Sequence, residues 1–82
     1  MSGSEEITID ARGHHCPVPT LRLRRAAEDA SPGALLVLYA DDPMARIDVP
    51  HFAGQAGLEI ISREDVGSGF CFKIRKPARS KL

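Results

Sequence analysis

The feature that most restricts the fold is an apolar segment at residues 34–40, Ala-Leu-Leu-Val-Leu-Tyr-Ala. Ser31-Pro32-Gly33 precedes this segment and Asp41-Asp42-Pro43 follows it, and both sequences are typical of turns. The segment is too short to span a membrane, and it lacks the polar alternation of a half-exposed strand. We therefore expect a central strand that other elements cover, near the middle of a sheet.

The segments on either side of this strand predict the order β-α-β-α-β-β. Strands are recognised by alternation or short apolar runs, and helices by their caps, prolines and apolar spacing. The helix after the first strand is expected to begin with Pro17 in its first position, and the second to begin at an Asp48 cap and end near Gly57. The expected elements are a strand at 6–10, a helix at 17–30, the strand at 34–40, a helical turn at 44–47 followed by a helix at 48–56, and strands at 58–63 and 70–75.

This order predicts an α/β (α+β) fold with two layers. Helices between strands imply parallel pairing with right-handed crossovers, and the last two strands are expected to form an antiparallel hairpin with Phe70, Phe72 and Ile74 toward the core. Because two helices cannot cover both faces of a four-stranded sheet, we expect a mixed sheet with both helices on one face. The 82 residues allow one domain, residues 1–82, with an ordered core at about 6–76 and a flexible tail at 77–82.

Charge and cysteine content limit the classes of function. Eleven basic and eleven acidic residues give a formal net charge of zero, which disfavours nucleic-acid or anionic-lipid binding driven by bulk charge. The two cysteines, Cys16 and Cys71, are too few for the disulfide framework of a small secreted domain, and the first residues lack a secretory pattern. We expect a cytoplasmic protein with reduced thiols, and a monomer as the simplest assembly.

The candidate site is the sequence Arg-Gly-His-His-Cys-Pro-Val-Pro at residues 12–19, between the first strand and the first helix. A thiol becomes a nucleophile when it loses its proton, and the N-terminus of a helix stabilises the thiolate by about 0.3–1 kcal/mol. Arg12, His14 and His15 are the cations available to add to this effect. Pro17 and Pro19 remove N–H donors but stiffen the helix start. An exposed thiol without a nearby resolving cysteine suits sulfur hand-off better than dithiol redox chemistry.

With this motif, the chain resembles the TusA-like (SirA-like) family of small sulfur carriers over about residues 7–76. The matching landmarks are Asp10-Ala11-Arg12-Gly13, Cys16-Pro17-Val18-Pro19, Ser31-Pro32-Gly33, Ala40-Asp41-Asp42-Pro43, Asp48-Val49-Pro50-His51-Phe52 and Gly57-Leu58-Glu59. The resemblance implies a two-layer fold, a persulfide on Cys16 and no bound cofactor. It also implies a cysteine desulfurase or rhodanese-like donor, and an acceptor protein in tRNA thiolation, molybdenum-cofactor synthesis or sulfur oxidation. His14-His15 departs from the family, which commonly has an apolar residue followed by a variable one.

Several side chains near the motif have more than one interpretation. His14 and His15 tune or shield the thiol, contact a partner, or have no role; adjacent positions disfavour a metal site with Cys16, and we expect no metal. Arg24, with the arginines beside it, forms either a solvated face or a docking surface for an acidic partner, and its side chain is expected on the side of the helix start. We interpret Cys71 as a compact packing residue rather than a second functional thiol. Asp41 and Asp42 are expected to act as turn and cap residues.

The alternative function is a regulatory or binding module without sulfur chemistry, which recognises RNA or protein through the arginine-bearing helix or the open sheet face. Three Phe and one Tyr provide few stacking surfaces, so direct nucleic-acid binding is the weaker form of this alternative. The sulfur shuttle would be an enzyme only in the sense that it forms a covalent intermediate. The reactivity of the Cys16 thiol distinguishes the two functions, because only the carrier needs an activated thiol.

Overall fold

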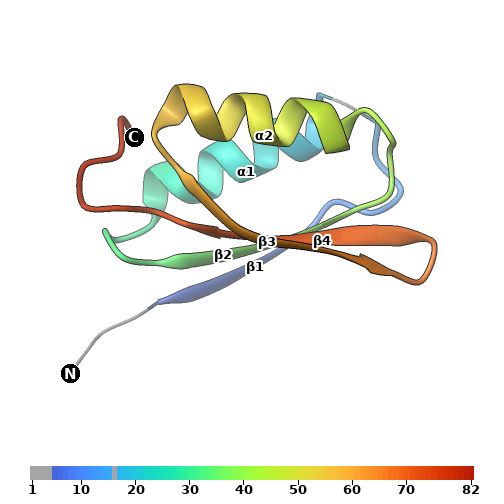
Figure 1. Ribbon diagram of the computed structural model, residues 1–82, viewed down its shortest axis with the longest axis horizontal. Coiled ribbons are helices and arrows are strands. Elements are labelled where there is room, and N and C mark those ends of the chain that lie inside the picture. Colours follow the sequence, from blue (N-terminus) through green and yellow to red (C-terminus); the bar gives the residue numbers. More distant parts are fainter. Residues whose placement is uncertain (1–4, 16) are drawn as a thin grey trace.

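The computed structural model describes residues 5–15 and 17–82, and two helices cover one face of a four-stranded sheet in it (Figure 1). This arrangement confirms the expected α+β class and the β-α-β-α-β-β order. None of the described helices is long and apolar enough to cross a membrane. The elements are β1 (Glu6–Asp10), α1 (Val18–Asp29), β2 (Leu35–Ala40), α2 (Ala45–Ala56), β3 (Glu59–Val66) and β4 (Gly69–Arg75).

The strands lie in the order β1-β2-β4-β3, so β2 is internal as expected. β1 and β2 pair in parallel, whereas β4 pairs antiparallel to both β2 and β3. The expected hairpin of the last two strands is therefore confirmed. The predicted parallel pairing is confirmed only for β1 and β2. β2 and β3 do not pair with each other, because β4 lies between them. In this position Phe72 of β4 lies opposite Leu38 of β2 on the core side of the sheet.

The hairpin between β3 and β4 is tighter than the sequence predicts. β3 continues to Val66 rather than ending near Arg63, and Val66 pairs directly with Gly69. Only Gly67 and Ser68 remain in the turn. Gly67, the first of these two residues, has a φ of 59°, whereas none of the described non-glycine residues has a positive φ. A positive φ at the first central position is typical of a two-residue hairpin turn that has glycine there.

α2 begins at Ala45, three residues before the expected cap at Asp48, and that prediction was wrong. Met44 is the N-cap residue instead, and Asp42 forms the turn before it: its side-chain Oδ1 accepts the N–H of Met44 and its main-chain oxygen accepts the N–H of Ala45. Pro50 consequently lies inside the helix, where it removes one helical hydrogen bond. Burial of Ala45 and Val49 against the sheet favours the longer helix. The expected end is confirmed, since Gly57 adopts a left-handed φ of 76°.

The hydrophobic core lies between the sheet and the helices. Phe70, Phe72 and Ile74 point into it, as their alternation predicts, and the two phenylalanine rings meet edge to face with centroids 5.6 Å apart. The helices contribute mostly small side chains, which lets them lie close to the sheet. The fully buried core residues include Leu23, Ala27, Leu36, Leu38, Ala45, Val49, Phe72 and Ile74.

The face of the sheet without helices is not uniformly exposed. Val37 and Cys71, on the two central strands, are buried there. Tyr39 is the register partner of Cys71, and the guanidinium of Arg12 lies over the Tyr39 ring at 5.4 Å. Cys71 is thus a buried side chain although it points away from the helices.

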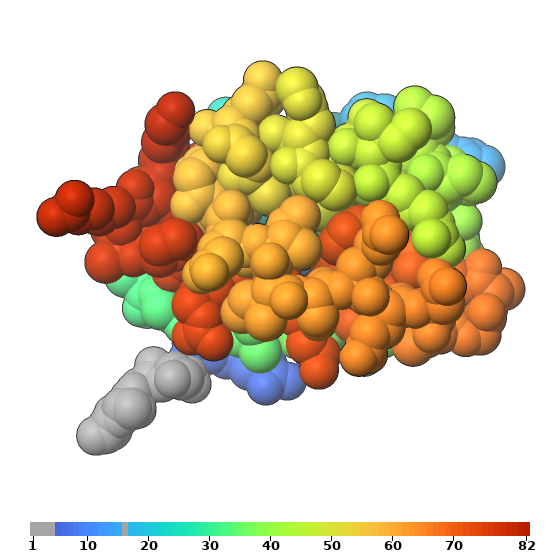
Figure 2. All heavy atoms as spheres, viewed as in Figure 1, coloured from blue at the N-terminus to red at the C-terminus, as the bar shows by residue number. Residues whose placement is uncertain are grey.

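The residues after β4 fold back onto the helical layer. Lys81 donates its main-chain N–H to the oxygen of Ala56 at 2.8 Å, and Leu82 packs against the edge of the core. The sequence predicts a flexible tail at 77–82, and the structure gives this segment specific contacts at the end of α2. In the space-filling view these residues lie beside the last turn of α2 (Figure 2).

Gly69 is required where β4 passes β2, and its replacement tests the strand order. A Cβ atom at this position would overlap the main-chain oxygen of Ala40, which the sheet holds in place. We expect Gly69→Ala to lower the free energy of unfolding by about 1–3 kcal/mol. Gly54→Ala is the matched control, because Gly54 is an exposed residue of α2 and a Cβ atom there meets nothing within 4 Å. This substitution should raise the free energy of unfolding by about 0.5–1 kcal/mol, since alanine favours a helix more than glycine does. Urea denaturation of both variants measures the difference, and equal stabilities would contradict this packing.

Candidate functional site

Two loops meet at the end of the sheet from which both helices start. Because β1 and β2 are parallel, the loop after each strand leaves the same edge (Figure 1). The main-chain N–H of Gly13 donates to both carboxylate oxygens of Asp41 at 3.0 Å. Gly13 has φ of 83°, a conformation that favours glycine. Asp41 therefore ties the loop of residues 11–15 to the end of β2.

Sequence reasoning missed this role of Asp41. It interpreted Asp41 and Asp42 as turn and cap residues; Asp42 does form a turn through its bond to Met44, but the N-cap residue of α2 is Met44 and no side chain caps it. Asp41 instead holds a residue 28 positions away in the chain, and no local pattern indicates that pairing. The available signal was the glycine before the cysteine motif, which marks a main chain free to approach a neighbouring group.

The start of α1 carries few hydrogen-bond donors. Cys16 itself lies outside the described residues. Pro17 is the N-cap residue, Pro19 lies in the first turn, and the N–H of Val18 is occupied by the oxygen of His15 at 2.9 Å. The three residues after the cysteine position thus offer no free N–H, as the prolines predict. The first turn contains no acidic residue, so no carboxylate there opposes the positive end of the helix.

Arg12 is bound to Asp10 rather than directed at the helix start. Its Nε and Nη2 donate to the two carboxylate oxygens of Asp10 at 2.9 and 2.8 Å. These bonds hold the pKa of Asp10 well below its usual range and raise the pKa of Arg12. The guanidinium also covers Tyr39. The geometry therefore favours the role expected for Arg12 as a positioning residue of the motif, which fixes the turn into the loop, over a role as a cation for the thiolate.

His14 and His15 are both exposed in the loop. The Nδ1 atom of His15 lies 3.8 Å from Oδ2 of Asp42, and the His15 side chain is 95% exposed. This distance permits a weak ion pair when the imidazole is protonated, but not a hydrogen bond. Among the residues that the structure describes, no three His, Cys, Asp or Glu side chains gather as a metal site would require.

Arg24 points away from the start of α1, contrary to the expectation. Its Nε lies 3.3 Å from Oε2 of Glu28, one turn further along the helix. The cause is the spacing of four residues, which brings the opposite charges together on one helical face. Arg24 therefore lies near the end of α2 and the C-terminal residues, where it lines a shallow depression with Phe52, Gln55, Ala56, Lys81 and Leu82.

Three large apolar side chains are exposed on the first turns of the two helices. Leu21 of α1 is 57% exposed, and Met44 and Ile47 at the start of α2 are 50% and 64% exposed. We call these residues the apolar rim. They lie at the starts of the two helices, at the end of the molecule that carries the loop of residues 11–15. Each of them fits an ordinary helical pattern, so the sequence alone does not indicate their exposure.

Cys71 provides the contrast to the motif cysteine. It is 4% exposed, and burial raises the pKa of its thiol. The thiolate is the reactive form of cysteine, so both properties protect Cys71 from electrophiles. The geometry gives Cys71 a packing role between β2 and β4.

We expect the Cys71 thiol to react with iodoacetamide at least about 100-fold more slowly in the native protein than in urea. A Cys16→Ser background isolates the reaction of Cys71 with iodoacetamide, and mass spectrometry of timed samples measures its rate. Equal alkylation rates with and without urea would contradict the burial of Cys71.

The burial of Cys71 also predicts a pH dependence of stability. The free energy of unfolding should fall as the pH rises above the usual thiol pKa of about 8.5, because Cys71 can ionise there only in the unfolded chain.

The fold and the loop define a class of small two-layer α+β proteins with a cysteine motif between the first strand and the first helix. A family model described as Sulfurtransferase TusA matches residues 7–76. The Sulfur carrier protein TusA of Pseudomonas aeruginosa strain LESB58 is 35% identical over 78 residues, which cover 95% of this chain and 99% of the relative. The protein of the same name from Pseudomonas paraeruginosa strain PA7 is 33% identical over 78 residues, which again cover 95% of this chain and 99% of the relative. The chain belongs to the TusA family.

Proposed function

We propose that this chain carries sulfur as a persulfide on Cys16 and passes it from a donor protein to an acceptor protein. The observation that carries the proposal is the Cys-Pro-Val-Pro motif at the junction of β1 and α1, within the region that matches the TusA family. The burial of Cys71 supports it, because it leaves Cys16 as the thiol suited to exchange. The relatives' names, which describe sulfur carriers, point to the same function.

The proposed chemistry is two thiolate displacements. The Cys16 thiolate attacks the outer sulfur of a donor persulfide, so a new S–S bond forms at Cys16 while the donor's S–S bond breaks and its cysteine leaves as a thiolate. An acceptor thiolate then attacks the outer sulfur on Cys16, and Cys16 leaves as a thiolate. Each step moves one sulfur atom at the same oxidation level, so neither an oxidant nor a bound cofactor is needed.

The partners of this relay belong to two classes. A cysteine desulfurase or a rhodanese-like protein is the donor, and a protein of tRNA thiolation, molybdenum-cofactor synthesis or sulfur oxidation is the acceptor. The chain acts as one cytoplasmic domain and as a monomer, without membrane contact or direct nucleic-acid binding. His14 and His15 are exposed in the loop of residues 11–15, directly before Cys16 in the sequence, where they contact whichever partner is docked.

Partners dock on the apolar rim, because its three exposed side chains stand at the starts of the two helices, at the end of the molecule where the transfer takes place. We expect Ile47→Asp to lower the second-order rate of sulfur uptake from a cysteine desulfurase about tenfold, since a charge would be buried in the contact. Ile61→Asp is the control, because Ile61 is also exposed but lies on β3, and its rate should change less than about twofold. Mass spectrometry of samples stopped at set times gives the rates of sulfur uptake. An equal loss of rate in both variants would contradict the docking site.

The proposed function is tested by loading and discharge. The protein is incubated with a cysteine desulfurase and cysteine, desalted, and weighed intact before and after addition of a small thiol acceptor. A carrier gains the mass of one sulfur atom and loses it to the acceptor. A protein that gains no sulfur from cysteine desulfurase or from a rhodanese loaded with thiosulfate would instead be a binding module, and the proposal would be wrong.

A further inference from the structure

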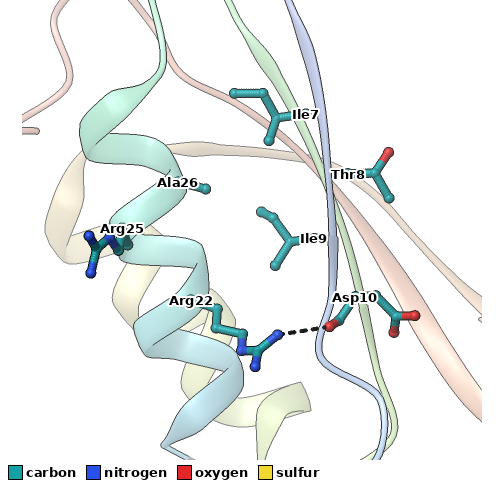
Figure 3. A pocket seen from close by; sticks show the side chains of 7 residues that line it. All are labelled: Ile7, Thr8, Ile9, Asp10, Arg22, Arg25 and Ala26. Atoms are coloured by element: carbon teal, nitrogen blue, oxygen red, sulfur yellow. Dashed lines mark hydrogen bonds between the residues drawn. The ribbon is translucent and has the colours of Figure 1, made fainter.

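A groove runs between the edge strand β1 and helix α1 (Figure 3). Its volume is about 430 Å³, and Ile7, Ile9 and Ala26 form its apolar floor. Figure 3 shows both isoleucine side chains directed toward the helix, and Arg22 reaching across to Asp10. The proposed sulfur relay does not use this surface.

The main chain of β1 presents hydrogen-bonding groups along this edge that no strand of the described part of the chain pairs with. Glu5 accepts a bond from Leu35, and Ala11 donates one to Tyr39, so the odd-numbered residues of β1 face β2. Main-chain groups alternate in direction along a strand, so those of Glu6, Thr8 and Asp10 point outward. The outward oxygen of Asp10 accepts Nη1 of Arg22 at 3.3 Å. Within residues 5–15 and 17–82, no strand pairs with this edge of β1.

The groove is positively charged. Arg22 and Arg25 line it, and among the described residues no carboxylate lies within ion-pair distance of either side chain. Asp10 is the acidic residue of the lining, and Arg12 already neutralises it. An extended segment beside β1 would place alternate side chains on the helical side, where the two arginines stand.

We propose that the edge of β1 binds an extended acidic segment of a partner protein by strand addition, with main-chain hydrogen bonds to Thr8 and its acidic side chains on Arg22 and Arg25. Strand addition supplies affinity through the main chain and specificity through alternate side chains. A second copy of this chain fits the edge poorly. Antiparallel pairing of β1 with itself would place the arginines of the two copies across from each other.

The test is an NMR titration of the full-length, uniformly ¹⁵N-labelled protein with a capped seven-residue peptide of alternating glutamate and valine. We expect the largest amide shifts at residues 6–10 and slower hydrogen exchange at the Thr8 N–H. Arg25→Glu should weaken binding about tenfold, because it reverses one charge of the groove. Arg63→Glu is the matched control on the opposite edge strand β3, and it should change the affinity less than about twofold.

Two further peptides separate strand addition from simple charge attraction. A peptide with lysine in place of glutamate should not bind, and a glutamate peptide with alternate N-methylated amides should bind at least about tenfold more weakly, since it cannot complete the ladder. Equal binding of the N-methylated peptide would overturn the proposal in favour of an anion site. Shifts centred on another surface, or dimerisation through β1 in sedimentation experiments without peptide, would also overturn it. None of these outcomes bears on the sulfur relay, which these experiments do not measure.

Discussion

Cys16→Ser is expected to abolish sulfur uptake from a cysteine desulfurase. A serine hydroxyl is not ionised near neutral pH and has no sulfur with which to form a persulfide, so no slow residual transfer is expected at this position. Intact-mass analysis after incubation with the desulfurase and cysteine measures the effect. The variant should keep the mass of the unloaded protein throughout, while the wild-type protein gains one sulfur atom.

Cys71→Ser is the matched control for this experiment, because it removes the other thiol and leaves the motif unchanged. Cys71 is buried between β2 and β4, so its thiol is not accessible to a partner's persulfide. The variant should load to the same extent as the wild-type protein at a temperature where it is folded. Loading of the Cys16→Ser variant would show that Cys16 is not the carrier residue. Loss of loading only in the Cys71→Ser variant would contradict our account in the same way.

Lys76→Ala is expected to cause the largest loss of stability among the substitutions considered. The residue follows β4 and is 5% exposed, and its Nζ donates to the main-chain oxygens of Ala27 and Ala30 at 2.6 and 2.8 Å. Ala27 lies in the last turn of α1 and Ala30 is its C-cap residue, and the main-chain oxygens at this end of a helix attract a positive charge. Removing the side chain leaves both oxygens without this donor and opens a cavity, so the free energy of unfolding should fall by about 3–4 kcal/mol.

Two variants separate the bonds made by Lys76 from its bulk. Lys76→Met keeps most of the volume but loses the ammonium, and it should cost about 2 kcal/mol. Lys73→Ala removes an exposed lysine of β4, three residues before Lys76, and should change stability by less than about 0.5 kcal/mol. Urea denaturation gives all three values. A Lys76→Met variant as stable as the wild-type protein would show that the ammonium contributes nothing beyond packing.

The elements of the fold could be predicted because their signals are local. The apolar run at 34–40, the alternation at 70–75 and the stops at Gly33 and Gly57 each depend on neighbouring residues. The position of β4 between β2 and β3 could not be predicted in this way, since strand order depends on contacts between distant segments. The start of α2 was missed for a related reason. Asp48 has a good capping side chain, but burial of Ala45 extends the helix to an earlier residue.

The candidate site was predicted in part. The motif at 16–19 and its place between a strand and a helix follow from sequence, since both depend on residue type and order. The Asp41 bond to Gly13 and the Asp10 bonds to Arg12 depend on how side chains turn after the loops are closed. Lys76 was overlooked because a lysine after a strand usually ends in solvent, whereas here the end of α1 provides two oxygens for it.

The most direct test of the sulfur carrier function locates the added sulfur. The wild-type protein is loaded by a cysteine desulfurase, the persulfide is trapped with iodoacetamide, and trypsin releases Cys16 in residues 13–22 and Cys71 in residues 64–73. Our account predicts that the extra sulfur is found in the peptide of residues 13–22. Extra sulfur in residues 64–73, or an unloaded peptide of residues 13–22 from protein that has gained sulfur, would contradict it.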